Sequence, residues 1–242
     1  MSRPIRIEIE DGWYHVISRG IERRDIFQDD SDRSDFLERL FGLTESHALL
    51  VHAYCLMGNH FHLQVQTPQS NLKDAMQRLL SGYAVRFNLR HRRAGPLFQG
   101  RYRAILAGEA EWISEVNRYI HLNPVRLESL DLGKQRQAEI RRGIEKPADE
   151  ALVRRRLELL RAYPWSSYRA YAGAISPGRH NCKKPMCSVV LRAAPGSNKG
   201  RPFAIIRRAP FAKASNAMDC WSAFVTGCSW AARNGQKTCA SI

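Results

Sequence analysis

The chain has no long apolar run and no paired-cysteine motif. No window of its 242 residues offers the roughly 18 apolar residues that a membrane-spanning helix needs, and the N-terminus is too charged for a signal peptide. None of the six cysteines forms a Cys-x-x-Cys pair, and five of them follow residue 181, which argues against a zinc ribbon and a secreted disulfide framework. We therefore expect a cytoplasmic protein without a membrane partner.

Acidic residues are also scarce, and most of the imbalance lies near the C-terminus. The chain carries 38 Lys+Arg against 23 Asp+Glu, a formal net charge of +15. Between residues 174 and 242, Asp219 is the single acid against 11 Lys+Arg. A charge balance of this kind favours a polyanionic partner, and nucleic acid is the first candidate.

The composition predicts two regions. Residues 1–173 show regular apolar periodicity and are long enough to bury a core, whereas residues 174–242 show no sustained periodicity. We predict one folded domain over 1–173 and a basic, disordered or non-native extension over 174–242, such as translation out of frame would produce. The alternative is a basic arm that binds nucleic acid.

Two histidines stand two residues apart in a segment where polar and apolar side chains alternate. In residues 60–66, Phe61, Leu63 and Val65 share one face of a predicted strand, and His60, His62 and two glutamines share the other. The strand-like run 49–57 precedes Gly58-Asn59, a favoured two-residue hairpin turn. This hairpin sets Leu56 opposite Phe61 and Tyr54 opposite Leu63. Both imidazoles then point away from the core together, which is half of a divalent-metal site.

The rest of residues 1–173 predicts a mixed fold. Strands are expected over 13–18 and 101–106, and helices from about residue 31, over 71–90 and over 109–122. Asp30, Ser31 or Asp32 is expected to cap the first of these helices and Asn71 the second. The second carries a buried stripe, namely Leu72, Ala75, Met76, Leu79, Leu80, Tyr83 and Phe87. The order strand, helix, hairpin, helix, strand, helix predicts an α+β fold, with an antiparallel sheet covered by helices on one face. The histidine face is expected to be open or covered only by a mobile helix.

The last of these helices carries a tyrosine and an amide on one face. Ile113, Val116 and Ile120 form its expected core stripe, while Tyr119 and Asn123 lie four residues apart on a neighbouring face. A lone helical tyrosine is usually a packing residue. Beside a metal site, however, a phenolate is a competent nucleophile at phosphorus.

Four ordered segments resemble the REP-associated tyrosine transposases, single-tyrosine HUH transposases related to the smallest insertion sequences. They are Gly12–Gly20, Tyr54–His62, Phe98–Tyr102 and Tyr119–Arg126, and a closing Tyr163–Tyr168 segment extends the resemblance over residues 4 to about 173. The resemblance implies a ferredoxin-like or RNA-recognition-like fold. It also implies an enzyme that cuts and rejoins single-stranded DNA containing hairpin or palindromic elements, as a monomer or homodimer.

The resemblance also implies a site. His60 and His62 match the metal ligands, Tyr119 the nucleophile and Asn123 a third ligand. Mg²⁺ or Mn²⁺ prefers about six ligands, so two imidazoles and an amide oxygen leave room for phosphate oxygens and water. Attack by Tyr119 would leave a 5′-phosphotyrosine and a free 3′-hydroxyl. The arginines expected to contact DNA are Arg19, Arg23, Arg24, Arg101, Arg103 and Arg126.

Two other functions stay open at this point. A catalytically silent nucleic-acid-binding protein could keep the same sheet and basic surface. A zinc hydrolase could use His60, His62 and Cys55 on the neighbouring strand. Residues 133–162 are also rich in arginine and could form either a solvated helix pair or a surface that faces DNA; they include Arg136, Arg141, Arg142, Arg154, Arg155 and Arg156.

Overall fold

The computed structural model describes residues 7–108, 110–144 and 149–172. These residues form two compact units, one of residues 7–124 with 160–172 and one of residues 125–159. The predicted extension over 174–242 lies outside the described residues, so the boundary after residue 173 stays a prediction. Among the described residues, no helix is both long and apolar enough to cross a membrane.

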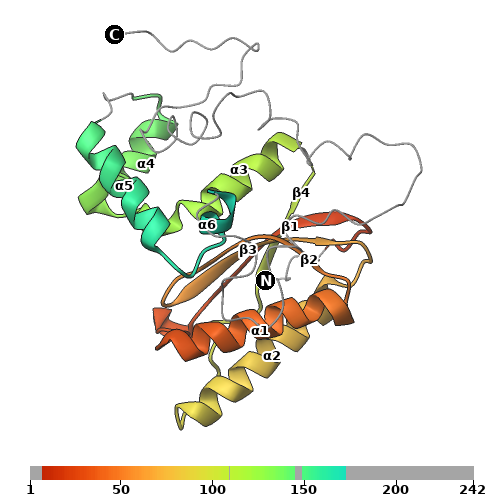
Figure 1. Cartoon of the computed structure of the whole chain (residues 1–242). Helices are drawn as coiled ribbons and strands as arrows, with labels where there is room; N and C mark the ends of the chain where they lie inside the picture. The colour runs from red at the N-terminus through yellow and green to blue at the C-terminus, as the bar shows by residue number, and fades with distance from the viewer. Residues whose placement is uncertain (1–6, 109, 145–148, 173–242) are drawn as a thin grey trace. The chain divides into compact units, whose positions relative to one another are not determined.

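A four-stranded antiparallel sheet is the centre of the first unit (Figure 1). Its strands are β1 (Gly12–Arg19), β2 (Leu50–Leu56), β3 (His60–Thr67) and β4 (Arg103–Ala107), in the spatial order β2-β3-β1-β4. The predicted hairpin is confirmed in register, since Leu56 pairs with Phe61 and Tyr54 with Leu63. The side-chain alternation along residues 60–66 therefore sets the two faces of the sheet as predicted.

Two helices pack on one face of this sheet and enclose the core. α1 (Asp30–Ser46) and α2 (Leu72–Arg90) lie side by side below the strands in Figure 1. Every residue of the predicted α2 stripe is buried. The cap of α1 is Asp29, one residue before the predicted candidates, and its side chain accepts a hydrogen bond from the Asp32 amide at 3.0 Å. Asn71 occupies the N-cap position of α2, but its amide donates to the His47 carbonyl instead of capping the helix.

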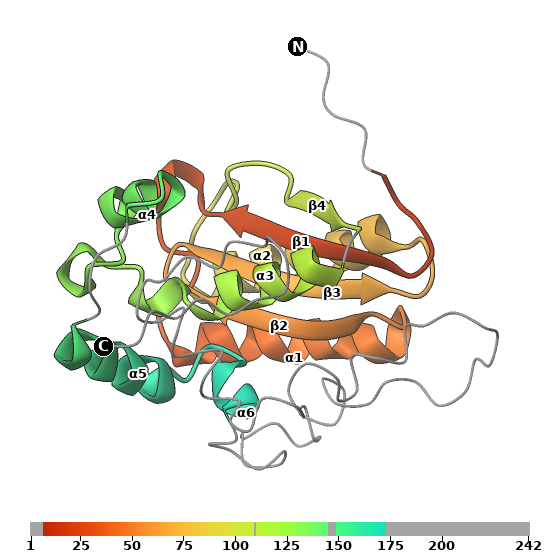
Figure 2. The same ribbon diagram turned by 90° about the horizontal axis from the view of Figure 1, so that it is seen from above.

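A third helix covers part of the opposite face, which carries the histidines. α3 (Ala110–His121) packs against β2, β3 and β4, and Figure 2 shows it lying across the strands. Its predicted stripe is buried, with Val116 and Ile120 packed on Ala53 and Cys55 of β2. Of the two expectations for the histidine face, the open face is wrong and a covering helix is present, because α3 forms a small apolar core there.

The segment after residue 162 closes the outer edge of β2. Leu56 N donates to the Trp165 carbonyl at 2.9 Å and Ser167 N donates to the Tyr54 carbonyl at 3.0 Å, with Cys55 and Ser166 in an antiparallel bridge. A short helix, α6 (Tyr168–Tyr171), follows. An unpaired strand edge is a site of unwanted association, and here the chain itself occupies it.

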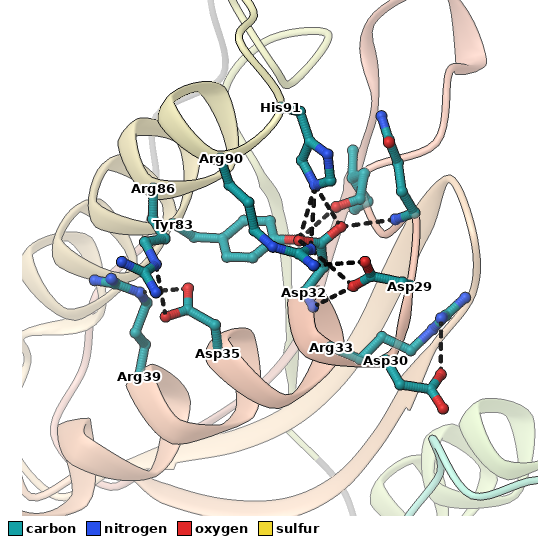
Figure 3. Close-up of polar contacts among 12 residues, drawn as sticks. Asp29, Asp30, Asp32, Arg33, Asp35, Arg39, Tyr83, Arg86, Arg90 and His91 are labelled. Atoms are coloured by element: carbon teal, nitrogen blue, oxygen red, sulfur yellow. Dashed lines mark hydrogen bonds and ion pairs between the residues drawn. The ribbon is translucent and has the colours of Figure 1, made fainter.

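A polar network joins the start of α1 to the end of α2 (Figure 3). The Asp32 carboxylate is buried and accepts from Arg90 at 2.5 Å, from His91 at 2.9 Å and from the Gln28 amide at 2.9 Å. Arg90 also pairs with Asp29 at 2.6 Å. The hydrogen bond to Arg90 is the first cause that holds the pKa of Asp29 well below its usual range.

The second unit is helical. It contains η3 (Glu128–Leu130), α4 (Lys134–Arg141) and most of α5 (Glu150–Ala162). Arg136 and Arg156 are buried, and Arg156 donates to the Leu130 carbonyl at 2.8 Å. At these two positions, the arginine-rich segment serves the fold and does not offer a surface to DNA.

Candidate metal and nucleophile site

The turn that joins β2 to β3 fixes the first histidine. Asn59 Nδ2 donates to the Arg23 carbonyl at 3.0 Å, which turns Asn59 Oδ1 toward His60 Nδ1 at 2.7 Å. An amide oxygen only accepts, so His60 carries its proton on Nδ1 and its lone pair on Nε2. Burial, with the nearby positive charge of Arg19 as a second cause, lowers the pKa of His60 to about 4. A neutral imidazole with a defined tautomer is the form that binds a metal ion.

The loop before α1 supports the same turn. Ile26 N and Phe27 N both donate to the Gly58 carbonyl, at 2.9 and 3.1 Å, and Gly20 N donates to the Asn59 carbonyl at 2.9 Å. A Cβ at Gly20 would collide with the Arg24 carbonyl oxygen, so the sequence needs glycine there. The position of His60 therefore depends on a loop more than thirty residues earlier in the chain.

A third histidine, on β1, holds His62. The register sets His15 opposite Gln64, and its Nε2 reaches diagonally to His62 Nδ1 at 3.0 Å. Both rings are buried and lie stacked with centroids 5.3 Å apart. Because Nδ1 of His62 is engaged with His15, coordination of a metal ion falls to Nε2, as in His60.

α3 brings Tyr119 to this pair of histidines. The Tyr119 ring lies edge-on to His62 and His15, with centroids 5.4 and 5.5 Å away, and His60 lies 5.1 Å from His62. Tyr119 is 37% exposed, so a substrate can reach it. The sequence separates Tyr119 from His62 by 57 positions, and the packing of α3 brings them together.

Hydrogen bonds to the sheet fix the position of α3. Gln64 donates to the Ile113 carbonyl at 2.7 Å and accepts from Asn117 at 3.0 Å. At the other end, His121 Nε2 lies 2.7 Å from Ser167 Oγ, which also accepts from the Tyr54 amide at 2.9 Å. Burial lowers the pKa of His121 to about 3, so the ring is neutral. The segment 163–168 thus joins the end of α3 to the edge of β2.

Asn123 lies just beyond the end of α3, one turn after Tyr119. Its Nδ2 donates to the Tyr119 and Ile120 carbonyls at 2.9 and 3.1 Å. This arrangement ends the helix and assigns the amide nitrogen to the backbone, which leaves metal binding to Oδ1. The role of Asn123 as a ligand stays a prediction.

The predicted DNA-contacting arginines fall into three groups. Arg19 lies opposite His60, and Arg103 lies opposite Ile17, the residue that faces His62, so both are exposed on the histidine face. Arg23, at the end of the 3-10 helix η1 (Ile21–Arg23), and Arg101, in the segment before β4, are exposed, whereas Arg24 pairs with Glu22 at 2.6 Å. Arg126 belongs to the second unit.

The residues that could hold a divalent cation are His60, His62 and Asn123. Two imidazole Nε2 atoms and an amide oxygen can bind a divalent cation and leave coordination positions open for substrate oxygens and water. Cys55 is paired with His62 in the sheet, but it is buried among the α3 contacts, and its Sγ lies 3.7 Å from Met57 Sδ. Across the described ranges, no group of three or more His, Cys, Asp or Glu side chains is placed to hold a metal ion.

Comparison with known families agrees with this geometry. Residues 8–123 match the family model described as "Transposase IS200 like". This segment of the chain resembles the IS200-like transposases. The matched segment contains His15, His60, His62, Tyr119 and Asn123, so the candidate site lies inside it.

Two solved structures resemble the chain at low sequence identity. A REP-associated tyrosine transposase bound to a REP hairpin is 14% identical, covers 73% of this chain and 89% of its own, and has a TM-score of 0.48. A candidate transposase from Deinococcus radiodurans R1 is 19% identical, covers 50% and 94%, and has a TM-score of 0.35. No curated protein matches the chain.

The sequence analysis did not predict three residues of this arrangement. His15, His121 and Ser167 stand inside the motifs that carry the resemblance, but none belongs to a local pattern that indicates a site. Tyr14 and Val16 face the core, so His15 between them must lie on the opposite face of β1, and this alternation could have indicated its place.

Proposed function

We propose that this protein is a transposase that cuts and rejoins single-stranded, hairpin-containing DNA through a covalent intermediate on Tyr119. The observation that carries the proposal is the convergence of His60, His62 and Tyr119 on one face of the sheet, with successive ring centroids 5.1 and 5.4 Å apart. A nucleophile close to a pair of metal-binding groups is what phosphoryl transfer to a protein hydroxyl needs.

Residues of this chain hold the reacting groups. His60 and His62 would hold Mg²⁺ or Mn²⁺ through Nε2, with Asn123 Oδ1 as a third ligand. When bound, the ion polarises the scissile phosphate and neutralises its developing charge. Arg19 and Arg103, exposed on the same face, neutralise neighbouring phosphates and hold the strand across the site.

The chemical step exchanges one phosphate ester for another. Tyr119 Oη loses its proton and forms a bond to phosphorus, while the bond from phosphorus to the 3′ oxygen breaks and that oxygen leaves as a hydroxyl after taking up a proton. The products are a 5′-phosphotyrosine and a free 3′-hydroxyl. Attack of a 3′-hydroxyl on the phosphotyrosine reverses the step and joins strands, and no nucleotide triphosphate is consumed.

A denaturing gel tests the proposal. The full chain is incubated with an end-labelled hairpin oligonucleotide with single-stranded flanks and Mn²⁺, and the expected result is a labelled protein band. Tyr119→Phe should abolish this band while hairpin binding stays within a few fold, because the change removes the nucleophile and little packing. Tyr171→Phe is the matched control, since Tyr171 is 38% exposed against 37% for Tyr119. An adduct that survives in Tyr119→Phe contradicts the assignment, and tight binding without any adduct favours the silent binding protein.

A further inference from the structure

His15 contacts both halves of the candidate site. Its Nε2 lies 3.0 Å from His62 Nδ1, and its ring lies edge-on to Tyr119 with centroids 5.5 Å apart. His15 is 6% exposed and His62 is 4% exposed, so this hydrogen bond is shielded from water. A polar pair this deeply buried between a sheet and a helix is costly to form unless both partners are satisfied.

We propose that His15 is a positioning residue for the reaction: it accepts a hydrogen bond from His62 Nδ1–H and thereby directs His62 Nε2 toward the metal ion, while its ring packs against the nucleophile Tyr119. This inference rests on the proposed function, because it gives His15 a role only if His62 is a metal ligand. His15 contacts neither the metal ion nor the phosphate in this role.

Proton counting leads to this assignment. A neutral imidazole carries one N–H donor and one acceptor, and a metal-bound Nε2 leaves the proton on Nδ1. His62 therefore donates and His15 Nε2 accepts, which places the His15 proton on Nδ1. Orientation of a ligand histidine through its second nitrogen is a general feature of metal sites.

The two proposed metal ligands are thus oriented by hydrogen bonds to different residues. Asn59 orients His60 from the adjacent position in the turn, whereas His62 depends on a residue of another strand, 47 positions earlier. A side chain that starts opposite Gln64 must reach diagonally across the strands, so it needs both length and an acceptor at its tip. Histidine and glutamine meet both conditions, and leucine meets only the first.

The variants for the test are His15→Gln, His15→Leu and, as a control, His52→Leu. His52 is a residue of β2, where it stacks on Trp13 with ring centroids 3.9 Å apart and its Nε2 lies 3.3 Å from Gln66 Oε1. Mn²⁺ binding to the full chain without DNA is measured by isothermal titration calorimetry. The rate of adduct formation is then measured in single turnover at saturating hairpin DNA, and hairpin affinity and thermal unfolding are recorded for each variant.

We expect His15→Leu to weaken Mn²⁺ binding by roughly 10–100-fold and to slow adduct formation, with hairpin affinity unchanged. His15→Gln should recover most of both losses, because its amide oxygen accepts the same hydrogen bond. His52→Leu should leave Mn²⁺ affinity and the adduct rate close to those of the unchanged protein.

Three results would overturn the proposal. They are wild-type Mn²⁺ affinity in a folded His15→Leu variant, equal losses in the glutamine and leucine variants, and no Mn²⁺ binding by the unchanged protein. If the unchanged protein binds Mn²⁺ with the expected order of variants but forms no adduct, the positioning of His62 by His15 stands and the proposed reaction fails.

Discussion

Removal of the Asp32 carboxylate is expected to destabilise the first unit strongly. This carboxylate accepts hydrogen bonds from Arg90, His91 and the Gln28 amide, and the residue is 3% exposed. It joins the first turn of α1 to the end of α2 (Figure 3). Asp32→Ala leaves the Gln28 amide and His91 without this acceptor, although Arg90 keeps its pair with Asp29.

The expected cost is about 3 kcal/mol. Breaking a buried ion pair by removing one partner costs roughly 3–5 kcal/mol. The Arg90 side chain is 34% exposed, however, so water and Asp29 compensate part of its charge, which places the value at the lower end. For a chain of this size a loss of about 3 kcal/mol lowers Tm by roughly 6–12 °C.

Urea denaturation followed by circular dichroism measures this loss. Asp30→Ala is the matched control, because Asp30 lies in the same turn but its side chain is 78% exposed and 3.4 Å from Arg33. An exposed pair and the helix dipole together contribute under about 1 kcal/mol. Equal destabilisation in the two variants would refute the reasoning, since burial would then add nothing to the Asp32 interactions.

Four further predictions concern the site and its support. Ser167→Ala should lower the free energy of unfolding by about 2 kcal/mol and slow adduct formation, because it leaves a buried amide and imidazole without their shared partner; urea denaturation and the adduct assay measure both. Arg19→Gln with Arg103→Gln should weaken hairpin binding and reduce its salt slope by about 0.7 for each lost phosphate contact, measured by filter binding at several salt concentrations. EDTA should stop adduct formation while hairpin DNA stays bound, because phosphate contacts carry the binding; adduct formation in EDTA would exclude the metal site. Burial lowers the pKa of His52 to about 4 from its ordinary 6.5, so between these pH values the unfolded chain takes up a proton that the folded chain does not. Stability should therefore fall as pH drops from 6.5 toward 4, and His52→Leu should reduce this slope by up to about 1.4 kcal/mol per pH unit in urea titrations.

Local periodicity predicted the elements and their faces. The alternation at residues 60–66, the Gly58-Asn59 turn and the α2 stripe each lie within a short stretch, and all three are confirmed. Predictions were wrong where a side chain contacts residues that are distant in the sequence. Asn71 looked like a helix cap and instead holds the His47 carbonyl, and Arg136 and Arg156 looked like surface residues although they are buried.

The sequence by itself determined that two histidines share one face of a strand, because side chains of a strand alternate and the apolar ones must be buried. Its motifs also indicated Tyr119 and Asn123. Only the tertiary structure decided that β1 sets His15 against His62, that α3 brings Tyr119 over both, and that Ser167 joins α3 to the edge of β2. The reason is physical: these contacts join residues 46 to 113 positions apart, and they form only once the sheet has closed and its helices have packed.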